Sequence, residues 1–116
     1  MSAPLHGPAS FYQGDDYEID GALHDAAGNP LPIGAGDAVQ WRLEDALGNM
    51  VFDFAIGNGI TVTDAANGII RIAITAAQSL PLAPGFYGDQ CRATVAGVNS
   101  TQWVGSIEIK KSFFVP

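Results

Sequence analysis

The sequence is poor in the residue types that most often perform catalysis or hold a metal. It has one cysteine, Cys91, and two histidines, His6 and His24, in 116 residues. A lone thiol cannot form an internal disulfide, which excludes a disulfide-stapled secreted miniprotein. His24 stands beside Asp25, but no HExxH, CxxC or similar ligand spacing occurs. We therefore expect no catalytic residue, no metal site and no cofactor.

Charge is scarce too, with charged residues making up 15% of the chain against about 25% in an ordinary globular protein. Twelve acids outnumber five lysines and arginines, which gives a net charge of −7. Binding to nucleic acid requires a basic face that neutralises phosphates, and an anionic membrane surface requires one as well. We therefore expect neither partner. The one basic pair, Lys110 and Lys111, suits the solvated end of a strand.

Targeting and membrane-spanning segments are also missing. The opening residues MSAPLHGPAS have no basic start and no apolar core, and a charge or a proline interrupts each apolar stretch. We expect a protein made in the cytoplasm without a signal peptide. Its length suits one domain. The predicted divisions are a flexible leader over residues 1–10, a single domain over 11–112 and an apolar tail over 113–116.

What the chain does contain is alternation of apolar and polar residues with a period of two, the pattern of half-buried strands. The predicted inward sets are Tyr17, Ile19, Gly21 and Leu23; Val39, Trp41 and Leu43; Phe52, Phe54 and Ile56; Ile60 and Val62; Ile70, Ile72 and Ile74; Tyr87, Cys91, Ala93 and Val95; and Trp103, Ile107 and Ile109. Asp89 interrupts one set, which indicates a bulge or a strand edge. We expect Trp41 and Trp103 to be mostly buried core anchors and Cys91 to be a packed, unreactive thiol.

The connections complete the fold prediction. Only residues 75–80 look helical, because Thr75 can cap a single turn before a proline ends it. Turns that begin at Asp25, Asp45 and Asp64 repeat the motif Asp-Ala-x-Gly/Asn and could lie at one end of the fold. A calcium site there is the alternative, although no DxDxDG pattern occurs. About seven short strands without longer helices predict an all-β sandwich or barrel.

Several motifs together resemble a known family. They are the run GDDYEIDGALHDAAGNPLPIGAGDAVQWRLEDALGNMVFDF, the hairpin GITVTDAANGIIRIAIT, the segment AAQSLPLAPGFY and the closing strand WVGSIEI, which together span about 100 residues. They resemble the phage β-sandwich best known as the N-terminal domain of the baseplate upper protein. The resemblance implies an immunoglobulin-like antiparallel β-sandwich of about seven to eight strands, with one short helical turn near 75–80. Departures are Gly34–Gly36 after the crossover, Pro81 and Pro84 in a lengthened loop, and Asp89.

The resemblance supplies no catalytic residues to carry over. It implies a non-enzymatic structural or assembly module of phage or prophage type, like a tail or baseplate component, that acts through protein–protein contacts and can be incorporated into a virion. The alternative is a small stand-alone binding module for a carbohydrate or peptide, carried on a mobile element. An assembly module should expose an apolar patch or a free edge strand, whereas a sugar-binding module should expose a groove with aromatic rings.

The C-terminal residues Phe113, Phe114 and Val115 are the candidate interaction residues. They follow the last predicted strand, which should end near Lys111. Adjacent phenylalanines in an extended segment point to opposite sides, so one domain surface can hardly bury both. We expect this tail to contact another copy in a homo-oligomer or a separate protein partner. The alternative is a frayed terminus without a role.

Overall fold

A computed structural model describes residues 10–114 of the chain; residues 1–9 and 115–116 lie outside the described part. Its eight strands are β1 (Ser10–Tyr12), β2 (Tyr17–Ala22), β3 (Ala38–Glu44), β4 (Met50–Ile56), β5 (Gly59–Asp64), β6 (Ile69–Ile74), β7 (Gly85–Val95) and β8 (Val98–Lys110). Two short helical turns join them, η1 (Ala65–Asn67) and α1 (Ala76–Ser79). Thr75 caps α1 through a capping box with Gln78, which confirms the predicted helical turn.

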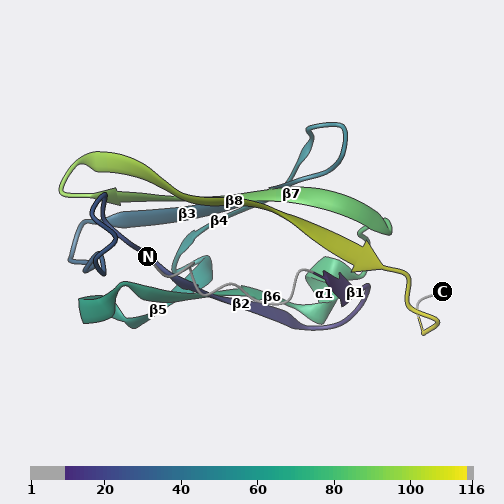
Figure 1. Ribbon diagram of the computed structural model, residues 1–116. Coiled ribbons are helices and arrows are strands. Elements are labelled where there is room, and N and C mark those ends of the chain that lie inside the picture. The colour runs from purple at the N-terminus through teal and green to yellow at the C-terminus, as the bar shows by residue number, and fades with distance from the viewer. Residues whose placement is uncertain (1–9, 115–116) are drawn as a thin grey trace.

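The strands form two packed layers, as Figure 1 shows. In hydrogen-bonded order the strands run β1-β8-β7-β3-β4-β5-β6-β2 as one continuous sheet. Figure 1 shows β8, β7, β3 and β4 in one layer and β5, β6 and β2 in the other. The chain crosses between the layers after β4, where Ala55 and Ile56 form a two-residue parallel bridge to β5. Strands β3, β7 and β8 packed on β2, β6 and β5 reproduce the two sheets of an immunoglobulin sandwich. The predicted fold class, an all-β immunoglobulin-like sandwich, is confirmed.

The core is built from the predicted alternating positions. Both layers contribute large side chains that are less than 2% exposed, among them Ile19, Ile72, Trp41, Leu43 and Ile107. Five predicted inward positions lie at the margin of the core. Ile56 is 40% exposed because β4 ends there and turns toward the other layer. The other four pack against the core but are only partly buried: Phe52, Val62, Val95 and Trp103.

The position of Asp89 differs most from the strand prediction. It is neither in a bulge nor at an edge: it pairs with Gly105 inside the β7–β8 ladder and is 2% exposed, and the bulge lies after it, between Cys91 and Arg92. The indole nitrogens of two tryptophans donate to its Oδ2 atom, Trp41 Nε1 at 3.0 Å and Trp103 Nε1 at 2.8 Å. These charge-assisted hydrogen bonds join β3, β7 and β8 from the inside.

The first strand was not predicted from the sequence. Ser10 was predicted to belong to the flexible leader, but it is the first residue of β1. This three-residue strand runs parallel to the end of β8. Three residues are too few to show a period of two, so the alternation rule could not find them. The β1 strand covers the last three residues of the edge that β8 would otherwise expose.

The three aspartate turns do not share one end of the sandwich. The Asp25 and Asp64 turns lie together, since Leu23 N donates to Gly68 O and Ile33 N donates to Ala65 O, both at 2.9 Å. The Asp45 turn lies at the opposite end, because β3 runs between the Asp25 turn and the Asp45 turn. Each aspartate carboxylate instead accepts backbone N–H bonds inside its own turn.

Removing the buried carboxylate should destabilise the fold strongly. In Asp89→Ala two indole N–H groups lose their shared acceptor in the core, and we expect the free energy of unfolding to fall by about 3–5 kcal/mol. Asp53→Ala is the matched control, because Asp53 is exposed and its salt bridge to Arg42 should contribute less than about 1 kcal/mol. Urea unfolding measures both. Equal losses for the two variants would contradict the role assigned to Asp89.

Tyr17 supplies a pH-dependent prediction. Burial, and then the charge of Asp89, raise the pKa of Tyr17 from 10.0 to about 12. The neutral phenol therefore contributes stability that is complete below pH 10 and is lost as the pH rises toward 12. Its hydroxyl is buried without a hydrogen-bond partner in residues 10–114. We expect the free energy of unfolding of Tyr17→Phe to be about 1 kcal/mol higher than that of wild type at pH 7 and to fall less above pH 10. Urea unfolding curves across this pH range measure both. Curves that match wild type would refute the role assigned to the buried phenol.

Candidate functional site

Exposed apolar side chains are concentrated at one end of the sandwich. At this end β7 begins and β3 and β8 finish, since Gly85 pairs with Ile109 and Gly88 pairs with Glu44. Figure 1 shows α1, β1 and the C-terminus together there, on the right. Of the ten exposed large apolar residues in the described chain, seven belong to it, and we call this surface the apolar end: Tyr12, Leu47, Met50, Leu80, Phe86, Phe113 and Phe114.

Local structure holds two of these side chains outward. The carboxylate of Asp45 accepts the N–H groups of Leu47 and Asn49, both at 2.9 Å, so the β3–β4 turn is braced and presents Leu47 at 88% exposure. The hydroxyl of Tyr87 donates to Ala83 O at 2.7 Å, which fixes the loop that leads into β7. Because neighbouring strand residues face opposite sides, the inward Tyr87 leaves Phe86 on the outer face, 66% exposed.

The C-terminal tail follows β8 and lies beside Tyr12 and Asp15, with which it lines a hollow. Strand β8 ends at Lys110, whose Nζ lies 5.6 Å from the centre of the Tyr12 ring, a cation–π distance. Beyond it Phe113 is 97% exposed and Phe114 is 98% exposed, so neither ring packs on the domain. Val115, the third predicted interaction residue, lies outside the described residues. The expected apolar tail is thus present in its described part, and its contact with a partner stays a prediction.

The opposite end of the sandwich is polar. It carries the Asp25 and Asp64 turns and Asp37, whose carboxylate accepts the N–H groups of Gly34 and Ala96. These two backbone hydrogen bonds lower the pKa of Asp37. Only Ile56 and Val98 among the exposed large apolar residues lie near that end. The concentration of apolar surface is therefore one-sided.

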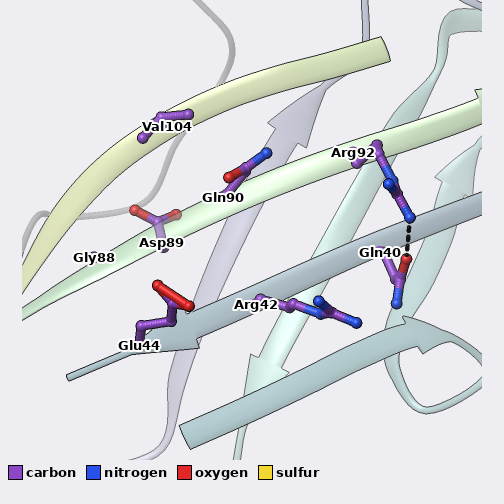
Figure 2. Close-up of a pocket in the computed structure, with 8 residues that line it drawn as sticks. All are labelled: Gln40, Arg42, Glu44, Gly88, Asp89, Gln90, Arg92 and Val104. Atoms are coloured by element: carbon purple, nitrogen blue, oxygen red, sulfur yellow. Dashed lines mark hydrogen bonds between the residues drawn. The ribbon is translucent and has the colours of Figure 1, made fainter. Parts of the chain in front are cut away.

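A shallow hollow of about 240 Å3 lies on the outer face of β3, β7 and β8 (Figure 2). Its lining residues are Gln40, Arg42, Glu44, Gly88, Asp89, Gln90, Arg92 and Val104. Arg92 Nη2 donates to Gln40 Oε1 at 3.0 Å, and Gln40 Nε2 donates to Asp53 Oδ1 at 3.2 Å. The Arg42 guanidinium pairs with Asp53 at 3.3 Å and lowers the pKa of that carboxyl. Such amide and guanidinium donors suit sugar hydroxyls or peptide carbonyls.

Of the reactive residues named in the sequence, Cys91 and His24 lie apart from both surfaces, and His6 lies outside the described residues. Cys91 is fully buried, and burial, followed by the charge of Asp89, raises the pKa of its thiol to about 12. The backbone of His24 bonds the Gln102 side chain through its N–H at 2.8 Å and its carbonyl at 3.2 Å. Residues 10–114 contain no group of three or more His, Cys, Asp or Glu side chains placed to hold a metal ion. No helix of this part of the chain is long and apolar enough to cross a membrane.

Sequence reasoning found the tail of the apolar end and missed the rest of it. Phe113 and Phe114 stood out because they follow the last strand. Two weaker signals were present. Phe86 is out of phase with the inward Tyr87, and Leu47 occupies the turn position that Ala27 holds in the parallel motif at Asp25. An apolar residue in an Asp-Gly-Asn turn has no core to enter, so it marks exposed surface.

The fold assignment rests on the strand order, because comparisons with known proteins identify no family for this chain. No protein-family model matches the chain, and no curated protein matches it. A structure of murine CRIg is similar at a TM-score of 0.48 and 15% sequence identity, over 96% of this chain and 99% of that one. The family resemblance to phage baseplate domains stays a prediction.

Cys91 should behave as an inert core residue. At pH 8 the raised pKa keeps the thiol protonated, and complete burial keeps reagents away. We expect labelling by a thiol reagent to be slow in the native protein and fast in denaturant, with the native rate set by unfolding. Mass spectrometry over time measures it. Rapid stoichiometric labelling of the folded protein would show that the inner face of β7 is misassigned.

Proposed function

We propose that this chain is a non-enzymatic structural or assembly module of phage or prophage type that acts through protein–protein contacts. The observation that supports this proposal most is the apolar end. Apolar area left in water costs about 25 cal/mol per Å2, and contiguous exposed patches usually mark interaction surfaces. Here two phenylalanines are almost wholly exposed, and Leu47 and Phe86 lie at the same end.

The placement of the aromatic residues favours a protein partner over a sugar. Trp41 is buried and Trp103 is partly buried, with both indoles bonded to Asp89, so neither offers a free face for stacking on a sugar ring. The exposed rings of Phe113 and Phe114 lie on the tail that follows β8. An apolar, exposed surface of this kind suits a second protein surface that can enclose it.

The hollow on the outer face supports the second candidate, a small binding module for a carbohydrate or peptide. Arg92 contributes a guanidinium to the hollow, and this group donates a hydrogen bond to the neutral amide of Gln40. Val104, 73% exposed, adds an apolar wall. Ligand pockets combine a few polar groups with apolar lining, but they usually enclose more volume than this hollow does. This candidate therefore ranks second.

Association with phage particles tests the proposed function. We expect the protein to co-purify with particles from induced cells of the source organism at a fixed copy number. A Leu47→Ser/Phe86→Ser variant should lose incorporation because it makes the apolar end polar. Val98→Ser is the matched control, since Val98 is 67% exposed at the other end and should leave incorporation unchanged. Particles that never contain the protein would refute the proposal, and glycan binding abolished by Arg92→Ala would favour the second candidate.

A further inference from the structure

We propose that two copies of this chain form a symmetric dimer in which the C-terminal tail of each copy binds the apolar end of the other. The donor segment is residues 110–114, and the acceptor surface consists of Leu47, Met50 and Phe86. This inference rests on the proposed function, because it uses the same apolar end. It adds that the partner bound there is the tail of a second copy.

The donor segment leaves the domain from a fixed point. The last residues of β8 pair with β1 on one side and with β7 on the other, and Lys110 lies over the Tyr12 ring. Immediately beyond, Phe113 and Phe114 make almost no contact with their own domain, since they are 97% and 98% exposed. Two rings presented from a well-anchored strand have lost part of their freedom before they bind, which lowers the entropy cost of docking.

The acceptor surface is already formed in the single chain. The β3–β4 turn that carries Leu47 is braced by Asp45, and Glu44 pairs with Gly88 at the base of this turn. Asp45 lies near enough to the start of β7 that its charge helps burial raise the pKa of Tyr87. The acceptor residues therefore lie around the same part of this end, and all three are exposed: Leu47 at 88%, Met50 at 56% and Phe86 at 66%.

Charge distinguishes the donor from the acceptor. The donor carries Lys110 and Lys111, two of the five basic residues in a chain of net charge −7. Three acids border the acceptor: Glu44 and Asp45 lie beside Leu47, and Glu108 pairs across from Phe86. Arg42, which lines the same hollow as Glu44, is paired with Asp53. Opposite charges on the two surfaces favour their encounter, while the excess of acid elsewhere disfavours other ways of associating. The acceptor thus fits a second copy of this tail.

Symmetry follows from the position of both surfaces at one end. A twofold axis through the apolar end lets each copy give its tail and receive the other, so both interactions close at once. The result is a closed pair and not an open chain. Once one tail has bound, the second binds within the same complex at a raised effective concentration.

Sedimentation equilibrium and light scattering on the full chain test the dimer. We expect dimers at high micromolar concentration. Phe113→Ser/Phe114→Ser should give monomers, and Lys111→Glu should weaken dimerisation about tenfold. Glu44→Lys should weaken it similarly, and the chain that carries both charge reversals should recover, because the two side chains exchange signs. Val98→Ser, a change at the opposite end of the sandwich, is the control and should dimerise normally.

The possible results separate this inference from the proposed function. A wild-type chain that stays monomeric at high micromolar concentration overturns the dimer, and so does a dimer that survives Phe113→Ser/Phe114→Ser. Failure of the double charge reversal to recover overturns the electrostatic match between the basic donor and the acidic border of the acceptor. A monomer that still enters particles would leave the proposed function standing without the dimer. A tail-dependent dimer that never enters particles would leave the dimer standing without the proposed function.

Discussion

A single buried carboxylate organises the interior of the larger layer. Asp89 on β7 accepts hydrogen bonds from Trp41 on β3 and Trp103 on β8, at 3.0 and 2.8 Å. A buried charge is costly unless donors compensate it, and here the donors come from the two strands that flank β7. Both indoles reach one oxygen only when the three strands are in the observed register. A slip of one residue would turn Asp89 outward and leave two N–H groups buried.

That register also determines what the apolar end contains. Because Trp41 pairs with Cys91 and Cys91 pairs with Trp103, the ladder runs on to place Glu44 beside Gly88 and Gly85 beside Ile109. The β3–β4 turn, the start of β7 and the departing tail are thereby brought to one end. Their apolar residues lie far apart in the sequence and become neighbours through strand pairing. The exposed surface is a consequence of the same pairing that builds the core.

The sequence was sufficient to predict the fold class and the core strands. It was not sufficient to predict β1 or these long-range contacts. Period-two alternation located the core strands, and the Thr75 cap located α1, because both signals are local. Asp89 was misread as a bulge or edge because a polar residue in an inward slot looks the same in either case. Its donors lie 48 and 14 residues away, and no local pattern reports such a pairing. The tail was foreseen because two phenylalanines after a last strand are also a local signal.

Core and exposed apolar surface are specified separately in this chain, which explains why most of the apolar end escaped prediction. The residues of the apolar end occupy turns, strand ends and the tail, where a side chain can change without altering the alternation that specifies the strands. Leu47 illustrates this: the Asp25 turn forms the same hydrogen bonds with alanine at the equivalent position. The aspartate fixes the backbone of the turn, and the side chain two residues later determines what the turn exposes. A sandwich of this kind can therefore acquire a partner by substitutions at its ends alone, with its core unchanged.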